Sequence, residues 1–233
     1  MFNLKKMAIA FFVFSCGASF SGAMGQLMEA NNPKENLYAG VGVGGSFNDD
    51  QLETQNVVFG STVNAASNNN QWVGNVFLGY GHTFMNSLFL GIEANTYFPH
   101  RTENFYSPGV TIVGPIYQDQ LAINDYLGLD LLPGYRVNSD LLIYGRAGLS
   151  FRDVSINQPE NTPNSPSFFN SDNSVGGRFG AGITYALNRH IAASVDYYYS
   201  YFPTFSSNWP LFNLQYNFKS HSNYAGFSLL YTV

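Results

Sequence analysis

The sequence has 233 residues and a net charge of −5, and only 11% of its residues are charged, against roughly 25% in soluble domains. An acidic chain with few, scattered basic residues is a poor candidate for nucleic-acid binding. Aromatic residues are plentiful, at 21 Phe and 16 Tyr, and no apolar run beyond the N-terminal region approaches the ~20 residues that a membrane-spanning helix needs.

The N-terminus has the pattern of a secretory signal peptide over residues 1–23. Lys5 and Lys6 precede an apolar run, and small residues up to Ala23 follow it, so that cleavage after Ala23 or after Gly25 fits equally well. Cys16 directly follows the apolar run and resembles a lipoprotein cleavage box, so its lipidation is an alternative to its removal with the signal. Residues 24–36 are then a short N-terminal extension.

Eight later segments alternate apolar and polar residues with the period of two that a strand with two different faces requires. The continuous apolar face of each segment packs either on the core of a soluble protein or against lipid. Glycines on the other face suit a narrow barrel. The predicted strands are residues 37–47, 72–83, 88–98, 121–136, 141–151, 175–187, 191–201 and 222–233.

The connections between these segments alternate regularly between long and short. Polar segments at 48–71, 99–119, 153–174 and 202–221 are predicted as long loops, and the turns at 84–87, 137–140 and 188–189 are short. A soluble β-sandwich has no reason to sort its loops in this way, whereas bacterial outer-membrane barrels combine short periplasmic turns with long extracellular loops. The pattern predicts an all-β fold, an eight-stranded antiparallel up-and-down transmembrane barrel over residues 37–233.

The hairpin of residues 121–151 shows both faces of the predicted barrel. Odd positions such as Ile123 and Leu149 form the lipid-facing side, and even positions such as Asp130 and Arg146 face the lumen. Pro133 interrupts the first strand of the hairpin, where it removes a ladder hydrogen bond, and is predicted to mark a bulge.

Five inward-facing charges lie at a similar distance from the short turns and are predicted to form an ion-pair network in the lumen. They are Glu93, Asp130, Arg146, Arg178 and Asp196. A charge inside a narrow barrel must be paired or hydrated, because burying it alone costs several kcal/mol. One hairpin register sets Asp130 opposite Arg146, and another sets Arg178 opposite Asp196. Under these pairings, exchanging Asp130 and Arg146 should preserve stability, and the network is either a structural plug or a gated ion path.

The residues YAGVGVGG, LFLGIEANTYF, LLIYGRAGLSF and the terminal GFSLLYTV resemble small eight-stranded outer-membrane barrels of the OmpA, OmpX and opacity-protein type. The resemblance covers residues 37–233 and implies a barrel without a periplasmic peptidoglycan-binding domain. It also implies an assembly signal in the last strand, matched here by Gly226, Leu229 and Tyr231, and hence the barrel assembly machinery and outer-membrane lipid, including lipopolysaccharide, as partners.

The long segments carry apolar side chains that are candidates for contact with a host or another surface. They are Phe105, Tyr106, Phe168, Phe169, Trp209 and Phe212. The alternative is that these side chains pack against one another or lie in the membrane interface. The predicted function is a structural or adhesin-like surface role at the outer membrane of a Gram-negative bacterium, with the loops outside the cell; a narrow pore is the second candidate.

Catalysis is the third candidate, because some related barrels act on lipids with a His and a Ser two positions apart. In this sequence His221 and Ser222 are adjacent, so they face opposite sides of a regular strand and cannot act as base and nucleophile. The remaining histidines have no metal-ligand spacing. A non-enzymatic protein without catalytic residues, metal or cofactor is therefore predicted.

Overall fold

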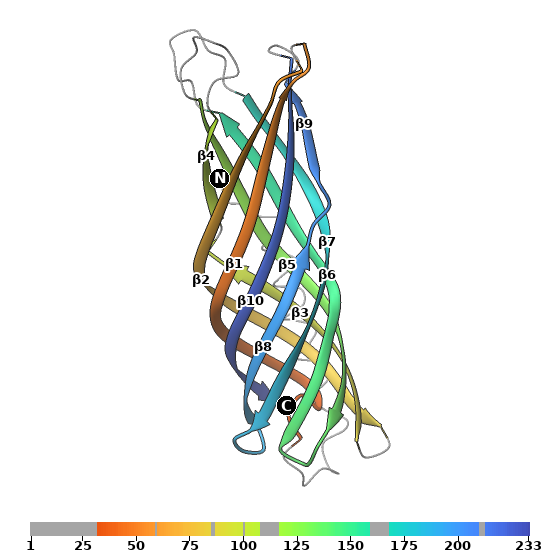
Figure 1. Ribbon diagram of the computed structural model, residues 1–233. Helices are drawn as coiled ribbons and strands as arrows, with labels where there is room; N and C mark the ends of the chain where they lie inside the picture. Colours follow the sequence, from red (N-terminus) through yellow and green to blue (C-terminus); the bar gives the residue numbers. More distant parts are fainter. Residues whose placement is uncertain are drawn as a thin grey trace.

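The computed structural model describes residues 32–58, 60–84, 87–99, 101–107, 117–158, 168–209 and 213–233. These parts of the chain form antiparallel strands that wrap into one closed sheet (Figure 1). The strands are β1 (Asn36–Asn56), β2 (Thr62–Phe84), β3 (Leu88–Phe98), β4 (Arg101–Ser107), β5 (Tyr117–Arg136), β6 (Leu141–Gln158), β7 (Phe168–Ala186), β8 (Ile191–Tyr201), β9 (Phe205–Trp209) and β10 (Leu214–Thr232). No helix in these ranges is long and apolar enough to cross a membrane.

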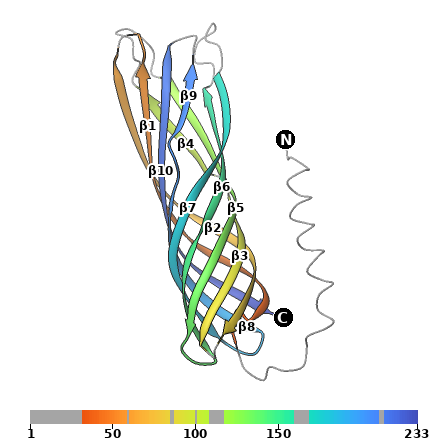
Figure 2. The ribbon, with the colours of Figure 1, turned by 90° about the vertical axis from the view of Figure 1, so that its right-hand side faces the viewer.

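The ten strands occupy eight positions around the barrel. β3 and β4 both pair with β5, one above the other, and β8 and β9 share the side of β10 in the same way. β1 pairs with β10 from Tyr38 to Asn56 and closes the sheet, as both views show (Figures 1 and 2). The predicted eight-stranded antiparallel barrel is confirmed.

The lower part of the barrel carries an outward-facing apolar belt. Fifteen of its aliphatic and Phe side chains are each at least 40% exposed, which would be an unusually large apolar patch for a protein in water. They are Val41, Val43, Val76, Leu88, Leu90, Ile92, Leu129, Leu131, Ile143, Leu149, Phe179, Ile183, Val195, Phe227 and Leu229. Aromatic side chains such as Trp72 and Phe47 above, and Tyr135 and Tyr231 below, mark its two ends, as in transmembrane barrels.

The short turns at the lower end are stabilised by asparagine side chains. Asn138 Oδ1 accepts hydrogen bonds from the backbone N–H groups of Asp140 and Leu141, at 2.9 and 2.8 Å. Asn188 Oδ1 does the same for His190 and Ile191, at 2.9 and 2.8 Å. An Asn at the start of a tight turn mimics a backbone turn with its side chain, which explains why both hairpins reverse here.

The upper end differs from the prediction, because much of the polar sequence predicted as long loops is strand. β1 continues to Asn56 and β2 begins at Thr62, so the 48–71 segment is mostly a hairpin; β4, β9 and the upper ends of β5, β6, β7 and β10 occupy parts of the other three segments. The ladder with neighbouring strands holds these polar residues extended, although their composition favours loops. This polar part of the sheet, above Phe47 on β1, is called the extension.

In the part of the extension that the structure describes, the wall is interrupted in two places. β2 has a ladder with β3 only up to Gly74, and above that residue it pairs with β1 alone, while β4 pairs with β5 alone. β7 and β9 likewise lie beside each other without a ladder. The interruption between β2 and β4 is called the β2–β4 seam.

The predicted bulge lies elsewhere in β5 than expected. The pairing of β5 with β6 keeps one register from Leu127 to Arg136, across Pro133, and shifts between Asp125 and Leu127. One extra residue turns every side chain beyond it to the other face. Ile123, predicted to face lipid, is therefore buried inside the barrel.

Candidate functional site in the barrel interior

The segment before β1 folds into the lower end of the barrel. Lys34 and Asn36 have positive φ angles of 62° and 59°, which bend the chain into the lumen. The buried Lys34 Nζ donates to Glu93 Oε2 at 2.8 Å and lies 4.5 Å from the ring centroid of Tyr144. The Glu93 carboxylate offsets the cost of burying the Lys34 ammonium group. Lys34 and Glu93 therefore form a buried ion pair inside the barrel.

The Glu35 side chain fixes the N-terminal segment at the lower end of the barrel, on the side opposite to Lys34. Its carboxylate accepts hydrogen bonds from Thr83 Oγ1 at 2.5 Å and from Arg136 Nη2 at 3.2 Å, and His82 Nδ1 lies 3.0 Å from it. Arg136 Nη2 also donates to the carbonyl of Pro33 at 3.2 Å. These bonds tie the N-terminal segment to β2 and β5.

Arg146 is the centre of the ionic network. It contacts three carboxylates: Glu93 Oε1 at 2.8 Å, Asp130 Oδ2 at 2.5 Å and Asp196 Oδ1 at 3.1 Å. The Tyr144 hydroxyl also donates to Asp196 Oδ1, at 2.7 Å. All these groups are buried, so each charge depends on the others for its stability.

Arg178 forms the upper layer of the network. Its Nε and Nη2 donate to the two oxygens of Asp130, at 2.9 and 2.6 Å, in a bidentate pair. Nη2 also donates to Asn95 Oδ1 at 3.0 Å and Nη1 to the Tyr97 hydroxyl at 3.2 Å. Tyr198, whose ring lies 4.8 Å from the guanidinium carbon, stacks on Tyr224 and completes this layer.

The structure brings together the five charged residues of the predicted network, but both predicted registers are wrong. Asp130 lies opposite Gly148, two residues from the expected pairing, and Arg146 reaches it diagonally. Arg178 lies opposite Ser200 and pairs with Asp130, and Asp196 pairs with Arg146. Alternation determines the face of a side chain, but a shift of two residues leaves every side chain on the same face.

Lys34 and Glu35 are the members of the site that sequence reasoning missed, because they lie in residues 24–36, the N-terminal segment before the first predicted strand. The charge count carried a signal: three predicted carboxylates faced only two arginines. With Lys34, Glu35 and Arg136 added, the lower and central clusters contain four cations and four carboxylates. The interior at this level is electrically balanced.

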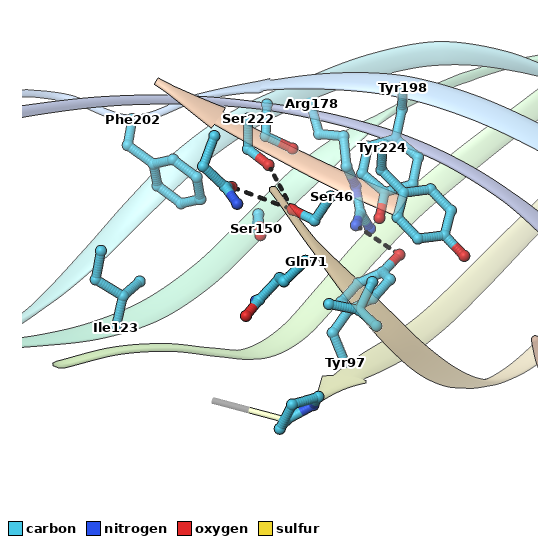
Figure 3. Close-up of a pocket in the computed structure, with 14 residues that line it drawn as sticks. Ser46, Gln71, Tyr97, Ile123, Ser150, Arg178, Tyr198, Phe202, Ser222 and Tyr224 are labelled. Carbon is cyan, nitrogen blue, oxygen red and sulfur yellow. Dashed lines mark hydrogen bonds between the residues drawn. The ribbon is translucent and has the colours of Figure 1, made fainter. Parts of the chain in front are cut away.

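A polar chamber lies above the network (Figure 3). The volume that water can occupy in it is about 40 Å³. Arg178 and Tyr198 form its floor, and its walls carry the hydroxyls of Ser46, Ser150 and Ser222. Above it, apolar side chains from both sides of the barrel pack together as an apolar plug. The plug consists of Leu52, Ile123, Val154, Phe205, Tyr216 and Phe218.

The remaining predicted residues lie outside the network. Gly226 faces inward under the ring of Tyr224, and Leu229 and Tyr231 face outward in the apolar belt. The residues predicted as loop contacts are in strands where the structure describes them. Phe105 and Tyr106 lie in β4, Phe168 and Phe169 in β7 and Trp209 in β9, while Phe212 lies outside the described residues.

The described residues offer no cluster of three or more His, Cys, Asp or Glu side chains that could hold a metal ion. His221 stacks on Tyr199 and Tyr201 on the outer face, and its Nδ1 lies 3.0 Å from the Tyr199 hydroxyl. Ser222 points inward, with its Oγ 3.3 Å from Ser46 Oγ. The two side chains lie on opposite faces and cannot act on one substrate.

Similar folds occur among solved outer-membrane proteins. The protease OmpT of Escherichia coli is 10% identical, with a TM-score of 0.50 over 89% of this chain and 99% of that one. Ail, the attachment invasion locus protein of Yersinia pestis, is 13% identical, with a TM-score of 0.37 over 83% and 99%. Neisserial surface protein A is 12% identical, with a TM-score of 0.41 over 84% and 97%. At this identity the likeness to OmpT shows the fold alone.

The family comparison agrees with the barrel geometry. No curated protein shows significant similarity to the sequence. The model of the outer membrane protein beta-barrel domain matches residues 14–229, most of the chain. The chain therefore belongs to the family of outer membrane protein β-barrel domains.

Proposed function

We propose that the protein is a closed, non-enzymatic barrel of the Gram-negative outer membrane that presents its extension to other molecules outside the cell. Membership of the family places the chain in the outer membrane. The observation that carries the rest of the proposal is the extension itself, a polar, hydrogen-bonded sheet above a filled lumen. The short turns then face the periplasm.

The extension is long enough to reach well beyond the membrane interface. From Phe47 to Asn56, β1 rises about 30 Å along its own axis at the usual spacing of strand residues. Its outward side chains change from apolar at Val43 to polar at Asp49 and Gln51. A polar sheet of this height stands in water, where other molecules can reach it.

The filled interior supports a surface role over transport. The chamber is closed below by the Arg146 and Arg178 ion pairs and above by the apolar plug, so the lumen has no continuous axial water path through the described residues. The hairpin of β1 and β2 gives the extension a paired, polar outer face that other molecules could recognise.

Trimming one hairpin of the extension tests this proposal. Asn48 pairs with Asn69, so joining these two residues through an Asn-Gly turn removes the upper β1–β2 hairpin and keeps the ladder below it. Bacteria that display the intact protein should adhere to cultured epithelial cells or to one another more strongly than bacteria without it, and trimming should abolish this gain.

Heat-modifiable gel migration from an outer-membrane fraction must first show that the trimmed barrel is folded. A Ser150→Ala variant is the matched control, because this change lies inside the chamber and leaves the extension intact. Equal adhesion by the intact, trimmed and empty-vector cells would overturn the surface role, and adhesion that survives trimming would exclude the β1–β2 hairpin as its source.

A further inference from the structure

The inner face of β2 in the extension is partly accessible to solvent, whereas that of its neighbour β1 is buried. Val63, Ala65 and Gln71 point inward from β2 and are all half-buried, although Ala65 also packs against the apolar plug. The inward residues of β1 at the same height, such as Leu52 and Thr54, are buried. Solvent therefore enters the extension along β2.

The β2–β4 seam explains this opening. Within the described residues above Gly74, no ladder joins β2 to β4, so this side of β2 lacks a strand partner there. The bulge between Asp125 and Leu127 disturbs the β5 strand that carries β4. The open strip along the inner face of β2 beside the seam is called the slot.

The slot leads down to the polar chamber. Gln71 of β2 lines the chamber at the base of the seam (Figure 3). Val73 of β2 and Pro99, just beyond the end of β3, are also part of the lining. The apolar plug closes the axial route from above, and the ionic network closes it from below. Among the described residues, the slot is therefore a lateral approach to the chamber.

The groups that line the chamber are suited to neutral partners. Ser46 Oγ donates to Asn48 Oδ1 at 3.1 Å, and further hydroxyls come from Ser150 and Ser222. Arg178 is the one charged residue of the lining, and all three of its side-chain nitrogens already donate to Asp130, Asn95 or Tyr97. An ion entering the chamber would lose hydration without gaining a counter-charge, which is costly.

The size of the chamber limits what it can hold. Its space is enough for roughly three water molecules, or for a polyol-sized group of similar volume. We propose that the β2–β4 seam admits water and small neutral hydroxyl-bearing solutes sideways into this chamber, and that ions are excluded from it.

Cysteine labelling tests both the access and the preference. In a Cys16→Ser background, which has no other cysteine, Ser150→Cys places a thiol in the chamber. Hydroxyethyl, sulfonatoethyl and trimethylammonioethyl methanethiosulfonate then serve as neutral, anionic and cationic reagents. Each rate is divided by the rate at the exposed position in Asn64→Cys. The neutral reagent should label Ser150→Cys at least about tenfold faster than either ion.

Two further variants locate the route. Gln71→Trp fills the base of the slot and should slow neutral labelling of Ser150→Cys about tenfold, because the indole blocks the approach to the chamber beside β2. Asn70→Trp is the matched control: it lies next to Gln71 on the outward face and should leave the rate unchanged. Ser228→Cys, buried below the chamber, should stay unlabelled.

Each result decides one part of the proposal. If Ser150→Cys reacts no faster than Ser228→Cys, the chamber is sealed and the proposal fails. If all three reagents label it equally after normalisation, neutral selection is wrong. If Gln71→Trp folds, as judged by heat-modifiable migration, and labelling is not slowed, solutes enter by another route. The comparison of reagents needs no bulky substitution, so it holds even if Gln71→Trp does not fold.

Discussion

At the scale of single residues, the interior depends on shared charges and not on separate pairs. Asp130 binds both Arg146 and Arg178, and Arg146 binds three carboxylates. Exchanging Asp130 and Arg146 would therefore place a second guanidinium against Arg178, and stability should not be preserved as the sequence alone suggested. A substitution at any one of these residues therefore affects several ion pairs at once.

Removing the central cation should destabilise the barrel strongly. Arg146→Met leaves three buried carboxylates with less positive charge, which costs about 3–5 kcal/mol of unfolding free energy. Urea unfolding in detergent, followed by heat-modifiable migration, measures this loss. Arg189→Met, at an exposed turn position, is the control and should change stability by less than about 0.5 kcal/mol. Equal midpoints for the two variants would contradict the central role of Arg146.

Inward glycines are a second feature at this scale. A Cβ at Gly79 would collide with the ring of Tyr38, and one at Gly182 with the ring of Tyr144. Gly44 and Gly226, opposite each other on β1 and β10, both lie under the ring of Tyr224. Glycine leaves room for large side chains from neighbouring positions, so the narrow lumen is filled by aromatic rings instead of methyl groups.

At the scale of elements, the short turns combine with long strands whose polar upper halves are held by pairing. The turns are stabilised by nearby residues, because Asn138 and Asn188 each accept hydrogen bonds from two backbone N–H groups of their own turn. The upper strands are stabilised by pairing with neighbouring strands, because their composition alone favours loops. The two ends of each hairpin are thus specified in different ways.

The turn at Asn138 can be tested by replacing its acceptor. Asn138→Ala removes two hydrogen bonds to backbone N–H groups and should lower the unfolding free energy by about 1 kcal/mol, since the groups are exposed to water. Asn138→Asp keeps an acceptor oxygen and should retain most of the stability. Urea midpoints of the two variants measure the difference, and the idea fails if alanine and aspartate behave alike.

The sequence predicted the eight strands around the apolar belt, their faces below the bulge and five charged residues of the central network, because an apolar residue at every second position has a direct physical meaning. It did not predict the register, since Asp130 opposite Gly148 and Asp130 opposite Arg146 leave every side chain on the same face. The bulge before Leu127 has no Gly or Pro to mark it. Lys34 was missed because its partner Glu93 is distant in sequence and no periodic pattern reaches it.

At the scale of the whole molecule, the barrel consists of an apolar belt around a neutral, filled interior, with a polar extension above it. Two charged layers, around Arg146 and Arg178, cross the lumen within the belt, and the apolar plug lies above the chamber. Water and small solutes can enter the chamber from the side without passing through. Reaching the chamber and crossing the membrane are therefore separate properties of this molecule.

The closed lumen predicts that the protein does not conduct ions. Purified protein inserted into planar lipid bilayers should give no discrete current steps, because an ion would have to break pairs such as Arg146–Asp130 and lose its own hydration. A general porin inserted under the same conditions shows that the assay detects open lumens. Reproducible unitary steps from the folded protein would contradict this prediction and favour the narrow-pore function.

The ladder between β1 and β10 also has a consequence during biogenesis. It joins Tyr38 to Thr232, and the Val233 N–H donates to the Leu37 carbonyl at 2.9 Å, so the sheet closes between the first and the last of its described strands. Until β10 is in place, one edge of β1 displays a long row of unpaired backbone groups that other chains can join. The unfinished barrel is therefore exposed to aggregation until β10 pairs with that edge.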